Sequence, residues 1–357
     1  MSGLTRHSDH LTSALAEVLD RFLGEHPTVP GTSVAVATGD HVVAIARGTA
    51  DPATGEPLTP RHALRLASST KPYVAGTTLV LAGRGALSLD SPVLDLVPAA
   101  VADLLRAHPH GRAITVDHLL QHTSGLVDHT AFDAFMGQVP GRRWTAIEQL
   151  RIGIGQPPLW APGTRFSYSD TGYVLLGAII EHVARQPLHR AVRDALALDR
   201  LGLEATWWET FEDPPPDVPR AHQLFEGVDT FDWDPSLDLY GGGGLVATPS
   251  DQARYWSLLF AGRVHRHLDQ QQAPLVPTAA PDGTPFGAGE AMGRGMFHVT
   301  VGGHELWGHG GFWGTREWFF PAAGVAVAVG ATHRTAVVDL ATALAAPVIA
   351  AVAEVLL

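Results

Sequence analysis

Apolar positions along the chain predict regular structure at both ends. Near the N-terminus they recur at helical spacing on one stripe, at Leu11, Leu15, Val18, Leu19 and Leu23. Residues 32–51 change to alternation around a Gly-Asp pair, which predicts a β-hairpin. Strand-like segments return after residue 293, and the apolar segment 336–357 predicts a packed terminal helix rather than a membrane span, because charged residues and a proline interrupt it.

Helical patterns dominate the middle of the chain. Residues 68–82 predict a helix that ends at two glycines, and residues 171–185 predict another. Strands at both ends with helices between them favour an α/β fold of the α+β type. We expect an antiparallel sheet flanked by the terminal helices, formed by 1–67 and 240–357, and an inserted, mainly helical domain, 68–239, with the active site at their interface.

Composition narrows the possible partners. The 357 residues carry a formal charge of −12, which disfavours binding to nucleic acid or to an anionic membrane surface. The absence of cysteine excludes thiol catalysis and disulfides. The N-terminus has no secretory pattern, so we expect a cytoplasmic protein. The sequence does not predict the oligomeric state.

One lysine stands out among 24 basic residues. Lys71, in "LASSTKPYVAG", is the only lysine of the chain. A crowded lysine can exchange a proton near neutral pH, whereas arginine stays charged. Ser68 lies three residues earlier and so on the same helix face, and Pro72 indicates that the helix begins close by. This spacing suits a hydroxyl activated by an amine, although a helix cap followed by an exposed lysine is the alternative.

Two further motifs follow in a characteristic order. After "SSTK" at 68–71 come "YSD" at 168–170 and "HGG" at 309–311. Together with segments 114–126 and 162–181, they resemble the penicillin-recognising serine hydrolases, in the branch of class C β-lactamases, DD-peptidases and EstB-type esterases. The resemblance covers roughly residues 30–332 and implies the β-lactamase/transpeptidase-like fold.

This resemblance implies catalytic roles for particular residues. Ser68 would be the acylated nucleophile, Lys71 would take or hold its proton, and Tyr168 would act as partner base, with its pKa lowered by Lys71. The backbone N–H groups of Ser68 and Phe312 would form the oxyanion hole.

The third motif would contribute to substrate binding. His309 would donate to a substrate carbonyl or carboxylate from a strand that lines the cleft. Gly310 and Gly311 would leave room for substrate against that strand.

One residue departs from the family pattern. Asp170 stands where the family usually has asparagine, and a carboxylate can accept hydrogen bonds but not donate them. Asp170 should hold Lys71 as a cation, which favours Tyr168 as the base and disfavours β-lactamase or DD-peptidase activity. A serine hydrolase that cleaves a small ester or amide is the leading hypothesis. An acyltransferase and a catalytically silent binding protein are the alternatives.

Two other features allow a functional and a structural interpretation. The acidic, aromatic segment 207–240, which contains Trp233, is either a lid that binds a hydrophobic or cationic substrate or a solvated loop. The 19 histidines include close pairs such as His118 and His122, but packing explains them better than a metal site. No cofactor motif is present, so we expect neither a cofactor nor a metal.

Overall fold

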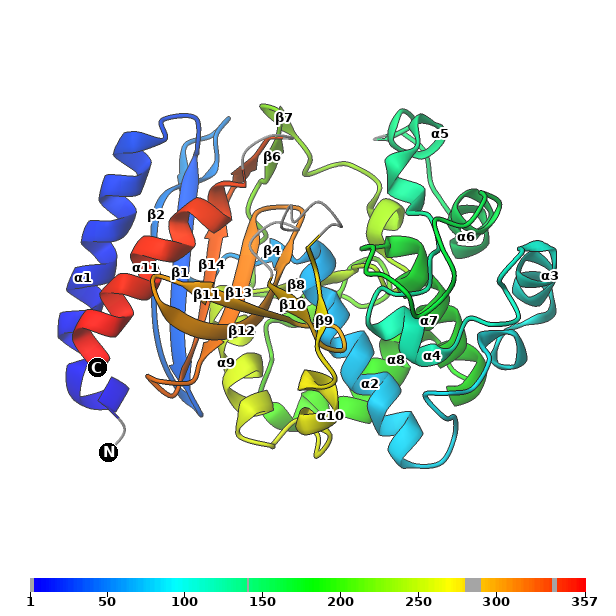
Figure 1. Ribbon diagram of the computed structural model, residues 1–357. Coiled ribbons are helices and arrows are strands. Elements are labelled where there is room, and N and C mark those ends of the chain that lie inside the picture. Colours follow the sequence, from blue (N-terminus) through cyan, green and yellow to red (C-terminus); the bar gives the residue numbers. More distant parts are fainter. Residues whose placement is uncertain (1–2, 140, 280–289, 336–338) are drawn as a thin grey trace.

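An antiparallel sheet built from the two ends of the chain organises the computed structural model, which describes residues 3–139, 141–279, 290–335 and 339–357 (Figure 1). Within these residues the sheet runs β3-β2-β1-β14-β13-β12-β11-β10-β9. Its strands are β1 (Gly31–Thr38), β2 (His41–Asp51), β3 (Glu56–Pro57), β9 (Val276–Pro277), β10 (Ala291–Met292), β11 (Phe297–Val301), β12 (His304–Gly311), β13 (Thr315–Phe320) and β14 (Val325–Ala331). The predicted fold class, with its antiparallel sheet, is confirmed.

The predicted hairpin is formed by β1 and β2, which pair from Gly31↔Gly48 to Thr38↔His41. Gly39 adopts a φ of +59° in the turn, which a glycine reaches without steric cost. The first strand then pairs with β14 from the other end of the chain. This long-range pairing joins the two ends of the chain in one sheet, and the helical insertion lies between them in the sequence.

The two faces of the central strands differ in side-chain size. Valines of β1 and β14 face one core with α1 (Gly3–Glu25) and α11 (Leu340–Leu356). Small alanines on the opposite face, at Ala35, Ala37 and Ala328, contact Ala253 of α9 (Pro249–Phe260). Both predicted terminal helices are confirmed, and residues 336–338 of the predicted C-terminal helix lie outside the described residues. Figure 1 shows α1 and α11 together on the outer side of the sheet.

The helical region lies on the other side of the sheet (Figure 1). Its helices are α2 (Lys71–Gly83), α3 (Ala99–Ala107), α4 (Val116–Leu120), α5 (Asp133–Met136), α6 (Ala146–Ile154), α7 (Asp170–Ala184) and α8 (Leu188–Leu196), and α10 (Leu268–Gln272) packs against α2. Short 3-10 helices occupy Ala67–Thr70, Val93–Leu96, His129–Ala131, Leu198–Leu201 and Pro235–Asp238. The core of this region continues into α9, so the division at residue 240 stays a prediction.

Two small sheets connect the regions. One runs β4 (Leu64–Arg65), β8 (Leu245–Ala247), β5 (Thr206–Trp208), and the other runs β15 (His333–Arg334), β6 (Leu224–Phe225), β7 (Val228–Asp229). Strand β4 leads directly into the turn that carries Ser68. In the part of the chain that the structure describes, no helix has the length and hydrophobicity needed to cross a bilayer.

Candidate active site

Ser68 lies in the 3-10 turn Ala67–Thr70, directly before α2. The preceding Ala67 has a φ of 45°, a left-handed conformation that costs a non-glycine residue about 1–3 kcal/mol. Pro72 occupies the first turn of α2, where its missing N–H group is tolerated. The predicted helix start near Ser68 is therefore confirmed, and its hydroxyl lies at the N-terminal end of a helix.

Lys71 is fully buried and points at Ser68. Its Nζ donates hydrogen bonds to Ser68 Oγ at 2.8 Å and to the carbonyl oxygen of Gly242 at 2.7 Å. It also forms an ion pair with Asp170. The predicted contact between the Lys71 amine and the Ser68 hydroxyl is present, and the alternative of a helix cap followed by an exposed lysine is wrong.

The surroundings of Lys71 and Tyr168 raise the pKa of both side chains, so both stay protonated. Burial alone would lower the pKa of Lys71, but the nearby Asp170 and Tyr168 outweigh it and raise the pKa above its ordinary value. Burial also raises the pKa of Tyr168 to about 12, although Lys71, 5.0 Å from its ring centre, acts in the opposite direction. The expectation that Lys71 brings the phenol pKa below its usual value is wrong, because burial dominates. At neutral pH the resting site therefore contains an ammonium and a neutral phenol.

His122 supports Tyr168, a role that the sequence did not indicate. The two rings stack with centroids 4.3 Å apart, and His122 Nδ1 accepts a hydrogen bond from the Ser169 N–H at 3.1 Å. Burial lowers the pKa of His122 well below its ordinary value, so the imidazole is neutral. No group of three or more metal-ligating side chains occurs among the described residues.

Three carboxylates gather near Lys71. Asp170 begins α7, and its N–H donates to Asp128 Oδ2 at 3.2 Å. Burial and the neighbouring Asp170 raise the pKa of Asp128 to about 6. The same two causes raise the pKa of Asp238 to about 7, against the pull of Lys71. Since Lys71 pairs directly with Asp170, the other two acids have no equally close cationic partner among the residues described.

His309 lies on β12, on the sheet side of Tyr168. Its ring is 6.2 Å from that of Tyr168 and 5.2 Å from that of Phe297. Burial, followed by the charge of Lys71, lowers the pKa of His309 to about 3. Nδ1 lies 2.8 Å from the Gly310 N–H and 2.9 Å from the Gly310 carbonyl oxygen; in the tautomer in which Nδ1 accepts from the N–H, Nε2 carries the proton and is a donor.

The two glycines after His309 also permit close packing. A Cβ on Gly311 would lie 2.0 Å from the carbonyl oxygen of Leu66, and a Cβ on Gly310 would overlap Arg316. Close packing of β12 against the nucleophile turn thus requires Gly311, whereas a side chain at Gly310 would displace the end of the Arg316 side chain. Both line the cleft, and the role predicted for them, leaving room for substrate, stays a prediction.

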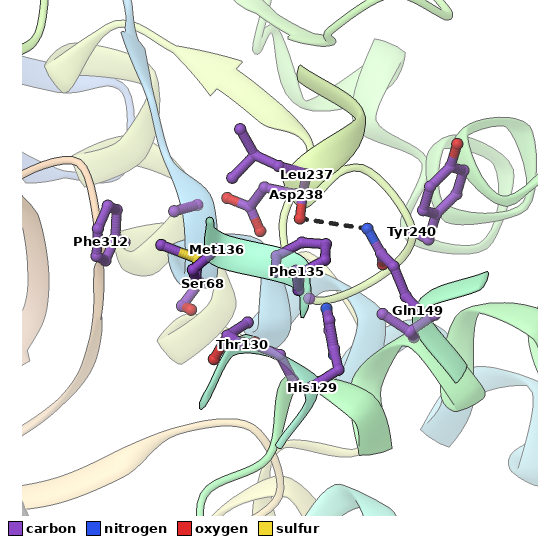
Figure 2. A pocket seen from close by; sticks show the side chains of 14 residues that line it. Ser68, His129, Thr130, Phe135, Met136, Gln149, Leu237, Asp238, Tyr240 and Phe312 are labelled. Carbon is purple, nitrogen blue, oxygen red and sulfur yellow. Dashed lines mark hydrogen bonds between the residues drawn. The ribbon is translucent and has the colours of Figure 1, made fainter. Parts of the chain in front are cut away.

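A pocket of about 170 Å³ opens beside Ser68 (Figure 2). Its walls combine apolar groups with acids and come from six separate segments: Ala67, Ser68, His129, Thr130, Phe135, Met136, Gln149, Asp170, Val174, Leu237, Asp238, Tyr240, Gly242 and Phe312. Gln149 Nε2 donates to the Leu237 carbonyl oxygen at 3.4 Å, which ties α6 to the turn at 235–238 (Figure 2). The α5–α6 residues gave no sequence signal, because only the fold brings them to Ser68.

A second, wider pocket shares Ser68, Thr130, Asp170 and Phe312 with the first. It extends along β12 past Tyr168, His309, Gly310 and Gly311. Trp233, predicted to bind substrate, lines neither pocket. Its ring instead meets Trp313 at 6.0 Å, and its carbonyl oxygen accepts from Arg65 at 3.0 Å.

The acidic segment 207–240 is fixed in place over most of its length. Glu209 accepts hydrogen bonds from Arg65 at 2.8 Å and from Arg220 at 2.7 Å. Only its C-terminal end, with Leu237, Asp238 and Tyr240, reaches the pocket. The segment therefore forms a wall of the pocket, and the interpretation as a purely solvated loop is wrong for these residues.

Comparison with known proteins identifies relatives of this arrangement. A family model described as Beta-lactamase matches residues 19–350. Esterase EstB from Burkholderia gladioli is 35% identical over 202 residues, which cover 54% of this chain and 50% of that protein. A D-aminopeptidase from Cereibacter sphaeroides is 27% identical over 83% of this chain and 55% of its own length. The matched region thus spans about half the length of these curated relatives.

A solved structure resembles nearly the whole chain. D-amino acid amidase from Ochrobactrum anthropi SV3, in complex with L-phenylalanine amide, superposes with a TM-score of 0.82 at 26% identity. The superposition covers 97% of this chain and 98% of that one.

Proposed function

Because the chain belongs to the Beta-lactamase family, we propose that it is a serine hydrolase that cleaves small amides or esters through an acyl-enzyme on Ser68. One observation carries the proposal: the only lysine of the chain, fully buried, donates to Ser68 Oγ at 2.8 Å where two pockets meet. Neither a surface serine nor a structural helix cap needs such a partner.

The proposed acylation step uses the residues around Ser68. Before acylation the Lys71–Tyr168 pair loses one proton to solvent, and the remaining proton is shared between the amine and the phenolate. Ser68 Oγ then bonds to the substrate carbonyl carbon while its own proton moves to Tyr168, which becomes the neutral phenol beside the Lys71 ammonium. Tyr168 then protonates the leaving amine or alcohol, and water later cleaves the acyl ester to release the acid. The N–H groups of Ser68 and Phe312 would bind the oxyanion, where loss of one donor typically costs about 3 kcal/mol. His309 Nε2 would donate a hydrogen bond to the substrate near its leaving group.

Amides or esters with a free amine fit the first pocket best. Phe135, Tyr240 and Phe312 offer aromatic walls, while Asp238 offers a carboxyl group with no direct ion-pair partner among the described residues. A substrate ammonium would favour the ionised form of Asp238. L-phenylalanine amide, bound to the related amidase, combines an amine with an aromatic side chain. An acyltransferase would share this acyl-enzyme, and added amines or alcohols would then divert the product from free acid.

Asp238→Asn is expected to reduce the preference for amine-bearing substrates. The ratio of kcat/KM for phenylalanine amide over its N-acetyl form should fall about tenfold, since a lost charge contact of this kind corresponds to about 1.4 kcal/mol. In the unchanged protein the same ratio should rise with pH toward about 7, as Asp238 ionises, and fall again above about 8, where the substrate amine loses its proton. Asp232→Asn, in an exposed part of the same segment, is the matched control. A ratio that Asp238→Asn leaves unchanged would refute an amine-binding role.

Covalent labelling tests the proposed nucleophile directly. A fluorophosphonate should add once to the protein, because Ser68 Oγ bonds to phosphorus and fluoride leaves. Intact mass spectrometry should show one adduct, and peptide mapping should place it on Ser68. An adduct on another residue, or none at all, would sink the acyl-enzyme proposal.

A further inference from the structure

Glu317 is a buried acid beneath the nucleophile turn that the proposed reaction does not use. It lies on β13, is 1% exposed, and neither carboxyl oxygen has a hydrogen-bond partner of good geometry among the described residues. It is paired across strands with His309, so both side chains point to the same face of the sheet. Burying an acid without a counter-charge is costly, and such a group needs an explanation.

The surroundings of Glu317 connect it to Ser68. Ser69, the residue after the nucleophile, is 1% exposed, and its Oγ lies 3.3 Å from Thr315 Oγ1. Thr315 Oγ1 donates in turn to the carbonyl oxygen of Leu66 at 3.4 Å, within the same turn. Thr315 and Glu317 alternate along β13 and so share a face, where the two hydroxyls lie close enough to affect the carboxyl.

The ionisable groups around Glu317 do not neutralise it. Tyr73 of α2, stacked on Tyr255 of α9, is a phenol whose pKa burial raises well above the ordinary value. His309 of β12 is neutral above pH 3. Arg316, the next residue on β13, is held by α11 on the opposite face, where its Nε donates to Thr342 at 2.8 Å.

Burial of Glu317 favours its protonated state. Burial raises the pKa of Glu317 to about 8, against the smaller effects of the Ser69 and Thr315 hydroxyls and of the Arg316 charge. A carboxylic acid can both donate and accept, as hydroxyls can, whereas a carboxylate only accepts. We propose that Glu317 is a positioning residue, whose protonated carboxyl bonds to the Ser69–Thr315 hydroxyl pair and holds the turn that carries Ser68.

The proposal rests on the proposed function, and the rate of fluorophosphonate labelling at pH 7 tests it. Glu317→Leu should label Ser68 at least tenfold more slowly, with full final stoichiometry, a lower kcat and an unchanged KM. Glu317→Gln, which keeps hydrogen bonding, should restore most of that rate. The leucine variant should still fold, because replacing a buried, unpaired acid by an apolar group is often neutral for stability. A leucine variant that labels as fast as the unchanged protein would overturn the proposal.

The pH profile separates positioning from mere packing. The ratio of labelling rates, unchanged protein over Glu317→Gln, should be constant below pH 7 and fall about fivefold between pH 7 and 9.5. Taking this ratio cancels the titration of the other site groups. Glu305→Gln, at an exposed position of β12, should give a flat ratio. A flat ratio for Glu317→Gln as well would count against the proposal.

Two outcomes of the labelling experiment require a further comparison. If Glu317→Leu does not fold, Ser69→Ala decides: it should slow labelling at least threefold, and an unchanged rate overturns the proposal. If the unchanged protein itself is never labelled at Ser68, the proposed function fails first. Labelling of Ser68 with no effect of these variants contradicts only the role of Glu317.

Discussion

Ser68→Ala is expected to lower kcat/KM about 10⁴-fold or more, because it removes the atom to which the acyl group bonds. The folded structure should persist, since the change removes only a hydroxyl at the cleft, which accepts a 2.8 Å hydrogen bond from Lys71 and contacts Tyr168. Steady-state kinetics on an activated ester, with thermal unfolding measured beside it, would separate loss of chemistry from loss of fold.

The control for this variant is another serine on a helix. Ser13→Ala removes an exposed hydroxyl from α1, far from the pocket in the sequence and on the outer side of the sheet, and should leave kcat/KM unchanged. If Ser68→Ala kept more than a tenth of the activity, Ser68 could not be the nucleophile.

Lys71→Arg should be the second most damaging change, with a loss of about 10³-fold in kcat. General acid–base groups typically contribute 10²–10⁴-fold, and arginine preserves the charge but not the ability to exchange a proton. The planar guanidinium also cannot reproduce the contacts of Nζ with Ser68, Gly242 and Asp170 in a fully buried site. The measurement is kcat together with the rate of fluorophosphonate labelling.

Chemical rescue tests whether Lys71 acts by exchanging a proton or only through its positive charge. Lys71→Ala should regain part of its activity in methylamine and none in guanidinium, because only the amine can cycle a proton. Equal rescue by both cations, or a fully active Lys71→Arg, would show that positive charge alone is sufficient.

Sequence patterns predicted the groups that are close together along the chain. The three-residue spacing of Ser68 and Lys71 fixes their geometry within one helical turn, so it could be read without a structure. The alternation in β1, β2 and β14 predicted strands, and the resemblance supplied Tyr168 and His309. These predictions needed only local geometry or a shared motif order.

What the sequence could not predict depends on burial and on distant contacts. The pKa of Tyr168 rises rather than falls, because a motif names the neighbouring charge but not the loss of solvent. Trp233 was assigned to the pocket on its aromatic character alone, which does not tell which way a side chain faces. Asp238 and Glu317 reach the site from segments about 170 and 250 residues after Ser68. Such convergence is a property of the tertiary fold.

The valine and alanine faces of the central strands separate two kinds of substitution. The valine side is covered by α1 and α11 and contains none of Ser68, Lys71 and Tyr168, whereas the alanine side meets α9, whose core also holds α2 and α7. Changes in the outer layer should therefore alter the lifetime of the folded molecule while turnover per folded molecule stays constant. Substitutions in that layer could therefore be chosen to increase stability without changing the catalytic residues.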